Sequence, residues 1–326
     1  MIILVSFTMN PLLDVVFDSE DYNPTSKETK LLSRAPIYLL HTWCWFPVHL
    51  AALAYSAYYI CLGSSGTLLE ISGVLASLTL IAGTGGFLIA HELIHRQSKW
   101  EKGLGIAILS LVCYSHWSVE HVKGHHKNVA TPNDPASARR GDNVYLFALK
   151  AMIGETKGSW HLEVQRQQRQ SPSVAPYSLT WWLNNHFVHF QLLHLAVISV
   201  GVFFFGLLFV PLYLCQSFGA IFLLEIINFT EHYGLERKEI SPGLYEPVGS
   251  QHSWNANTCM TNYLLMKLQR HTDHHMHPSR RFQCLRHLPD APQLPTGYTG
   301  MVILSLIPPL YRYVMDPRVL ALSSSK

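Results

Sequence analysis

Four long apolar runs, separated by polar segments, dominate the hydrophobic pattern of the chain. Each run approaches the roughly 20 residues that a helix needs to cross the hydrocarbon core of a bilayer. The first two runs are joined by GSSG and the last two meet at Pro211, so the runs form two hairpins. The pattern therefore predicts membrane-spanning helices over residues 37–63, 67–90, 187–210 and 212–230.

Lysine and arginine are absent from both hairpin turns and lie in the segments before, between and after the hairpins. An excess of these residues marks the cytoplasmic side of a membrane protein. We therefore expect the open ends of both hairpins to face the cytoplasm. The weaker apolar stretch at 103–121 is predicted to be a helix that dips into the interface or the core, and residues 127–185 are predicted to lie outside the bilayer.

The composition agrees with a membrane protein. Charged residues make up 14% of the chain, against about 25% in an average soluble domain. The net charge of +3 gives no reason to expect a nucleic-acid partner. The six cysteines form no CxxC pair and several lie in apolar runs, so they do not form a disulfide framework. We expect an all-α integral membrane protein with one domain over residues 1–326.

The chain has 19 histidines, and four short motifs hold the most suggestive ones. HELIHR and EHVKGHH contain histidines spaced i, i+4, which places two rings on one face of a helix. NFTEHYGL ends the fourth run, and LQRHTDHH follows further along the chain. All four motifs fall at the cytoplasmic ends of predicted helices, so they predict a histidine-rich cap. Its candidate metal ligands are His91, His95, His121, His125, His126, His232, His271, His274 and His275.

Nine imidazoles are too many for one zinc ion, which takes four ligands. Two metal ions with four or five histidines each would use them all. Imidazole suits Fe, Zn, Cu and Ni alike, so the ligand type alone leaves the metal open. The other ten histidines are expected to be mainly structural, with His252 and His277 as the strongest exceptions.

Four carboxylate residues directly adjoin proposed ligands in the sequence. One hypothesis is that they serve catalysis by orienting the ligand rings through hydrogen bonds. The alternative is that they are solvated or interfacial carboxylates. The four are Glu92, Glu120, Glu231 and Asp273.

The histidine motifs, read in full as HELIHR, EHVKGHHKNVATPNDPAS, NFTEHYGLER and LQRHTDHHMHPSRRFQCLR, resemble those of the integral-membrane alkane 1-monooxygenases. This family belongs to the membrane fatty-acid desaturase and hydroxylase superfamily. HSWNAN, LPTGYTG and PLLDVVFDSEDYNP are similar to segments of the alkane hydroxylases in particular. The likeness runs from about Asn10 to Val319, and all nine histidines match the family's ligand motifs.

The resemblance implies a non-haem centre with two Fe ions, which hydroxylates the terminal methyl group of an alkane or similar apolar chain with O2. It implies electrons from a rubredoxin-type donor and its NAD(P)H-dependent reductase, and a substrate that reaches the site from membrane lipid. Family members usually have a further helix pair before PLLDVVFDSEDYNP. We expect that pair to be missing here, which leaves substrate range and activity open.

Three alternatives remain beside an alkane hydroxylase. A fatty-acyl lipid desaturase or hydroxylase would share the metal site and differ in product. An inactive, truncated form would still bind iron. A metal-binding transporter or receptor would place its histidines near the bilayer midplane, whereas here they collect at one edge.

A basic run accompanies the last histidine motif. It would dock an acidic electron-transfer protein, or it reflects the positive-inside bias at lipid headgroups. The run comprises Lys267, Arg270, Arg280, Arg281 and Arg286.

Small residues before His91 are a further candidate feature. Gly83, Gly85 and Gly86 predict either close helix packing or space for a substrate chain. Nearby aromatic residues such as Trp45 would line that space or face lipid.

Overall fold

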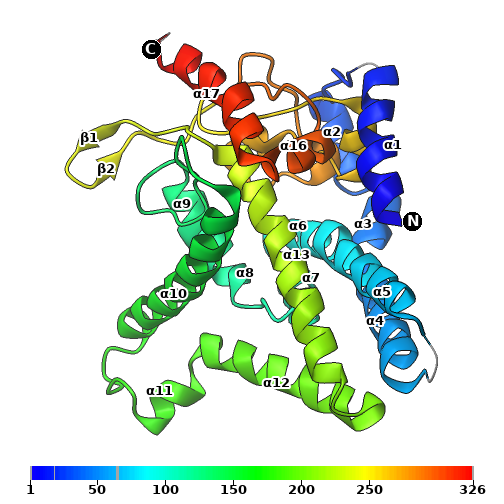
Figure 1. Cartoon of the computed structure of the whole chain (residues 1–326). Coiled ribbons are helices and arrows are strands. Elements are labelled where there is room, and N and C mark those ends of the chain that lie inside the picture. The colour runs from blue at the N-terminus through cyan, green and yellow to red at the C-terminus, as the bar shows by residue number, and fades with distance from the viewer. Residues whose placement is uncertain (1, 18, 64–65, 325–326) are drawn as a thin grey trace.

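The computed structural model describes residues 2–17, 19–63 and 66–324, and these are mainly helical, with long irregular stretches at 129–143, 233–258 and 285–297 (Figure 1). Their one β-sheet is a small antiparallel hairpin of β1 (Glu239–Ser241) and β2 (Leu244–Tyr245). Two residues of the expected GSSG turn, 64 and 65, lie outside the described residues.

Four helical segments are long and apolar enough to span a membrane, which confirms the prediction of four spans in two hairpins. The chain is therefore a multi-pass membrane protein. The first span comprises α3 (Pro36–Trp43), α4 (Trp45–Ala57) and η1 (Tyr58–Leu62), and the second comprises α5 (Leu68–Leu80), η2 (Ile81–Gly86) and α6 (Phe87–Ile94). The other two are α12 (His186–Phe205) and α13 (Phe209–His232).

Of the four carboxylate residues in the spans, Glu92 and Glu231 adjoin histidine motifs, and the other two have different surroundings. Glu70 lies in the first turn of α5, where Thr67 and Glu70 form a capping box that satisfies the free N–H groups of the helix end. Glu225 is fully buried in the middle of α13. Glu70 therefore caps the N-terminus of a helix, whereas the burial of Glu225 needs a separate explanation.

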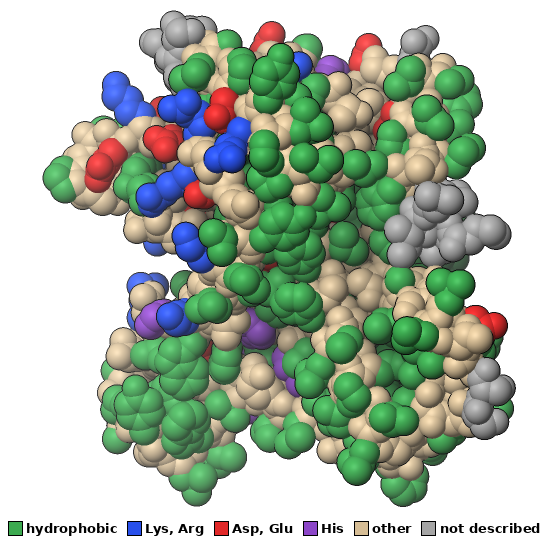
Figure 2. Space-filling model, in the orientation of Figure 1, with side chains coloured by type: hydrophobic (Ala, Val, Ile, Leu, Met, Phe, Trp, Pro, Cys, Tyr) green, Lys and Arg blue, Asp and Glu red, His purple; other side chains and the backbone are tan. Residues whose placement is uncertain are grey.

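The second hairpin is splayed. Figure 1 shows α12 diverging from α13 away from their short connection. Seen as a surface, the region of α11 (Leu179–Leu183) and α12 is mainly hydrophobic, whereas Lys and Arg gather on the side of the β1–β2 hairpin (Figure 2).

Shorter helices cover the ends of the spans. Between the two hairpins come α7 (Lys99–Ser110), α8 (Trp117–Glu120), η3 (His121–His125), α9 (His126–Asn128) and α10 (Val144–Gln170). The N-terminal part contributes α1 (Ile2–Val16) and α2 (Ser26–Leu32). The part after α13 contributes α14 (Cys259–Leu264), α15 (His271–Met276), η4 (Phe282–Cys284), α16 (Tyr298–Ser305) and α17 (Pro308–Ser324).

The weaker apolar stretch of the sequence packs inside the molecule. Helix α7 lies against α6 and buries Ile108 and Leu109 completely. The polar segment that follows contains α10, a helix of 27 residues that packs on α8 and α13. These contacts hold the histidine-bearing ends of α6, η3 and α13 next to one another.

Small residues allow α13 to approach the second span closely. A Cβ atom at Gly83 would lie 2.9 Å from Leu223 Cδ1, and one at Gly219 would lie 2.7 Å from Thr79 Cγ2. Close backbone approach at small residues is a common way for membrane helices to associate. Gly83 and Gly219 therefore set the spacing between the two hairpins, whereas Gly85 and Gly86 face Trp45 and His49 of the first span, and Gly83 and Gly85 also line a cavity.

Replacement of Gly219 by leucine is expected to force the hairpins apart, because the added atoms have no space beside Thr79. Overpacking of this kind costs about 1–3 kcal/mol. Thermal denaturation of the purified protein in detergent should show a lower midpoint. Gly73→Leu is the matched control, since no atom lies within 4 Å of a Cβ atom at that position. Equal midpoints for the two variants would contradict this packing role.

Candidate metal centre

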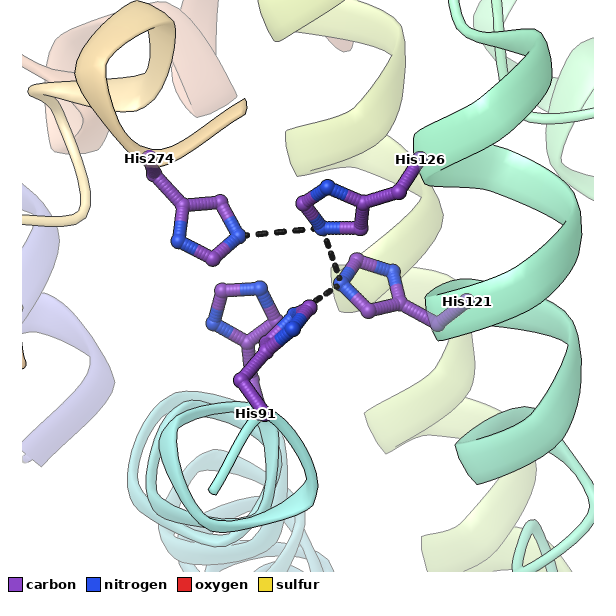
Figure 3. A group of neighbouring side chains, drawn as sticks. His91, His121, His126 and His274 are labelled. Carbon is purple, nitrogen blue, oxygen red and sulfur yellow. Dashed lines mark hydrogen bonds between the residues drawn. The ribbon is translucent and has the colours of Figure 1, made fainter. Parts of the chain in front are cut away.

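One group of five histidines gathers where α6, η3, α9 and α15 meet. Their ligand nitrogens all lie within 4.8 Å of one another. Figure 3 shows four of these rings pointing toward one another, with His121 and His126 on one continuous helical stretch and His91 and His274 on two other segments. We call the group of His91, His95, His121, His126 and His274 the first cluster.

A second group of four histidines lies beside the first. The Nε2 atoms of His232 and His271 are 3.3 Å apart, and those of His271 and His275 are 2.9 Å apart. We call the group of His125, His232, His271 and His275 the second cluster. The structure thus brings all nine sequence-predicted histidines into two adjoining sites of five and four.

Helix geometry explains which rings share a cluster. His91 and His95 lie one turn apart on α6, and His271 and His275 lie one turn apart on α15, so each i, i+4 pair stays together. His274 falls on another face of α15 and joins the first cluster.

The EHVKGHH motif divides differently from what its i, i+4 spacing suggests. The rings of His121 and His125 do stack, with centroids 5.2 Å apart. Their ligand nitrogens nevertheless belong to different clusters, because η3 is a turn of π-helix. The wider turn brings His126 Nε2 to 3.2 Å from His121 Nε2. π-Helical turns often occur at functional sites, where they change the direction in which side chains point.

The spacing of the nitrogens fits two metal ions. At a metal–nitrogen distance of about 2.05 Å, neighbouring ligand nitrogens around one ion lie about 2.9 Å (octahedral) to 3.3 Å (tetrahedral) apart. In the first cluster, consecutive Nε2 atoms of His95, His121, His126 and His274 lie 3.1, 3.2 and 3.1 Å apart. His125 Nε2 is also buried without a hydrogen-bond partner in the described chain. A metal ion in each cluster would satisfy these nitrogens.

The environment keeps most of these rings uncharged. Burial, reinforced by the neighbouring imidazoles, lowers the pKa of six histidines well below 6.5, so each presents a free lone pair at neutral pH. The six are His95, His121, His126, His271, His274 and His275. Uncharged ligands in this number can be buried together without mutual repulsion.

Three partners occupy the Nδ1 side of second-cluster rings. His125 Nδ1 lies 2.9 Å from Asp134, and His271 Nδ1 lies 3.1 Å from Glu231. His232 Nδ1 lies 3.3 Å from the carbonyl oxygen of His252. A partner on Nδ1 fixes the tautomer and leaves Nε2 for a metal ion. Burial by itself would lower the pKa of His125, but the Asp134 carboxylate outweighs burial and the pKa is raised.

The four carboxylates singled out from the sequence have different contacts. Glu231 faces a cluster histidine directly, as described above. Glu92 lies 3.6 Å from Arg96, and Asp273 pairs with Arg280. Glu120 is buried against Gly124 and Gly158. Their role in orienting ligand rings stays a prediction. Asp134 was missed, although it lies within the quoted stretch ATPNDPAS and directly contacts a cluster ring.

Hydrogen bonds and ion pairs anchor the segment that carries α15. Arg96 at the end of α6 donates to the backbone oxygens of Pro278, Ser279 and Arg280. Four of the five residues of the basic run pair with carboxylates of this chain, so their charges are used within the molecule. The pairs are Lys267–Glu20, Arg270–Glu20, Arg280–Asp273 and Arg281–Glu101.

The two expected exceptions among the remaining histidines lie outside both clusters. His252 is buried and contributes its backbone oxygen to His232, while its Nδ1 accepts a hydrogen bond from the Gly249 N–H. His277 is exposed just after α15.

Comparisons with known proteins agree with this geometry. A fatty acid desaturase family model matches residues 68–304. The chain is 40% identical to alkane 1-monooxygenase 1 of Pseudomonas aeruginosa, over 98% of this chain and 82% of that relative. The chain belongs to the alkane 1-monooxygenase family, within the fatty acid desaturase family.

Two further relatives match different shares of the chain. Alkane 1-monooxygenase 1 of Alcanivorax borkumensis is 36% identical over 98% of this chain and 77% of its own length. A xylene/toluene monooxygenase hydroxylase component of Pseudomonas putida is 27% identical over 74% of this chain and 63% of its own length.

Removal of one ring from either cluster is expected to release metal. His95→Ala and His275→Ala should each lower the content from about two ions per chain to about one, because each cluster loses a ligand. Elemental analysis of purified protein measures this. His277→Ala is the matched control, since His277 lies two residues from His275 and outside both clusters. Unchanged metal content in both cluster variants would exclude these residues as ligands.

Proposed function

We propose that this chain is a membrane non-haem di-iron monooxygenase that hydroxylates the terminal methyl group of alkanes. The balanced reaction is R–CH3 + O2 + 2 e− + 2 H+ → R–CH2OH + H2O. The observation that carries the proposal is a cavity that touches both histidine clusters. The names of the relatives support the same reaction class.

The cavity has a volume of about 500 Å³ and is lined mainly by apolar side chains from both hairpins and the cap. It reaches His91 and His121 of the first cluster and His271 of the second. Apolar cavities of this size commonly hold small ligands. An apolar chain in this space would have one end beside both clusters.

Membership of the alkane 1-monooxygenase family supports iron as the metal, since imidazole ligands alone leave the metal open, and each cluster would hold one ion. Bound iron would supply the redox chemistry that reduces O2 and breaks an unactivated C–H bond, which side-chain acids and bases cannot do. The protein's own part is positioning and the exclusion of water. Phe87 and Trp117, which lie against each other next to His91, close the cavity on the metal side with apolar surface.

The substrate enters from lipid, because alkanes partition into the hydrocarbon region. The electrons come from a rubredoxin-type donor with its NAD(P)H-dependent reductase at the cytoplasmic side. Two observations support that side: the clusters lie at the ends of spans, and the basic segments lie at the same ends. Because most of the basic run is paired internally, the donor's docking surface involves other residues as well.

The test uses the full chain in lipid nanodiscs, loaded with iron and supplied with donor, reductase and an alkane. We expect 1-alkanol that carries one oxygen atom from 18O2, detected by gas chromatography and mass spectrometry. His95→Ala should form none. A hydroxylated or unsaturated fatty-acyl product in place of 1-alkanol would assign the chain to acyl-lipid chemistry instead. Bound iron without any oxygenated product would show an inactive form.

Trp45 is expected to limit the length of chain that the cavity accepts. Its ring occupies the space beside Gly85, where a Cβ atom would lie only 1.9 Å from Trp45 Cζ2, and both residues line the cavity. Trp45→Ala should raise kcat/KM for longer alkanes relative to shorter ones by roughly 10-fold, since one or two extra buried methylene groups are worth about 1–3 kcal/mol.

Trp43→Ala is the control for this prediction, because Trp43 packs against Trp100 and does not line the cavity. The ratio of rates for a long and a short alkane, measured in one mixture, is independent of the amount of active protein. An unchanged ratio in Trp45→Ala would exclude Trp45 as the residue that limits chain length.

A further inference from the structure

Two buried glutamates face each other where α10 packs on α13. Glu155 of α10 and Glu225 of α13 are both fully buried, and their carboxyl groups lie close enough to interact directly. Tyr114 donates a hydrogen bond of 2.7 Å to Glu155 Oε2, and Asn228 donates one of 3.1 Å to Glu225 Oε2. Neither glutamate belongs to a histidine cluster.

The remaining oxygens of the pair are the place where a shared proton would lie. No N–H or O–H group of the described residues donates to Oε1 of Glu155 or to Oε1 of Glu225. Two carboxylates buried side by side cannot both be ionised, because the like charges repel in a medium of low dielectric. One proton between them removes the repulsion and forms the hydrogen bond that both oxygens lack.

The charges around the pair also favour retention of that proton. The titratable groups that act on it from the neighbouring segments are Tyr114, Glu120, His125 and Asp134. No lysine or arginine is among them, and two of the four are acids. Burial raises the pKa of Glu155 to about 7. The pair is therefore poised to gain and lose a proton near neutral pH.

The pair lies between the outside of the protein and the substrate cavity. On one side, a hollow of about 370 Å³ is lined by Glu120 and by Gly154 and Gly158, which flank Glu155 on α10. On the other side, Asn228 both holds Glu225 and lines the cavity. The hollow thus adjoins the part of α10 that carries Glu155, and Asn228 joins Glu225 to the cavity.

We propose that Glu155 and Glu225 share one proton and relay protons from this hollow to the cavity, where the reduction of O2 to water consumes them. The inference rests on the proposed function, whose reaction needs two protons at a site enclosed by apolar side chains. The electrons come from the rubredoxin-type donor, and the protons come from solvent. For each proton that reaches the cavity, the pair gives up one proton and regains one. Neither residue lines the cavity, so both act as relay residues and not as catalytic residues.

The shared proton is tested without metal or turnover. Infrared spectra of the metal-free protein at neutral pH should contain a protonated carboxyl band that shifts in D2O. The double variant Glu155→Gln/Glu225→Gln should lose part of this absorption, because other buried glutamates such as Glu120 keep theirs, and Glu163→Gln should keep all of it. Glu163 is the matched control, since it is a buried glutamate on the same helix that pairs with Arg166. Identical spectra of the wild type and the double variant would overturn the proposal.

Relay is tested in the iron-loaded enzyme. Glu155→Gln and Glu225→Gln should each lower turnover by about 10- to 100-fold, as expected for loss of a proton-transfer group. Metal content should be unchanged, the yield of alcohol per electron should fall, and the solvent isotope effect should rise. Glu155→Asp should recover part of the rate. Wild-type turnover should decline as pH rises through about 7, because the pair then loses its proton, and Glu155→Gln should not show this decline.

The results separate the two proposals. A wild-type enzyme that forms no alcohol overturns the proposed function, while the infrared result still decides whether the proton is shared. An active wild type with Gln variants of the same rate, electron yield and isotope effect overturns the relay alone. A Gln variant that loses iron together with activity assigns the pair a structural role and also overturns it.

Discussion

The structure depends on the packing of nine imidazoles, most of them uncharged, where apolar helices end. A buried ring nitrogen without a partner costs roughly 1–3 kcal/mol, so nine rings need either hydrogen bonds or metal ions. In the second cluster, Asp134 and the His252 carbonyl bind one nitrogen each of His125 and His232, and Glu231 lies 3.1 Å from Nδ1 of His271. The other nitrogens face one another at distances that suit a bound ion. Metal binding and the stability of the cap are consequently coupled.

The same constraint explains the departures from regular helix. The π-helical turn η2 directly precedes α6, and η3 carries His121 and His125. Without the wider turn of η3, His121 and His125 would present their ligand nitrogens in a common direction. With it, one motif of three histidines serves two sites. Helix α15 achieves the same division by ordinary α-helical spacing, with His274 in one site and His275 in the other.

The polar segment after the first hairpin contributes buried side chains to the protein interior, although its composition is that of an exposed segment. It forms the 27-residue helix α10, whose buried face includes Glu155 and the aromatic side chain of Phe147. Burial of glutamates on that face is possible because each finds a partner on a neighbouring element. Periodicity did not reveal this face, since polar residues are normally counted as exposed and only packing shows otherwise.

The sequence alone determined the four spans, because a bilayer requires about 20 apolar residues in each crossing helix. It also identified all nine histidines, since their spacing and their position at span ends set them apart. The tertiary structure decided how the rings divide into five and four, that Asp134 supports His125, and that Glu155 meets Glu225. The physical reason is that spacing along a chain fixes directions within one helix only. Contacts between distant segments depend on how those helices pack.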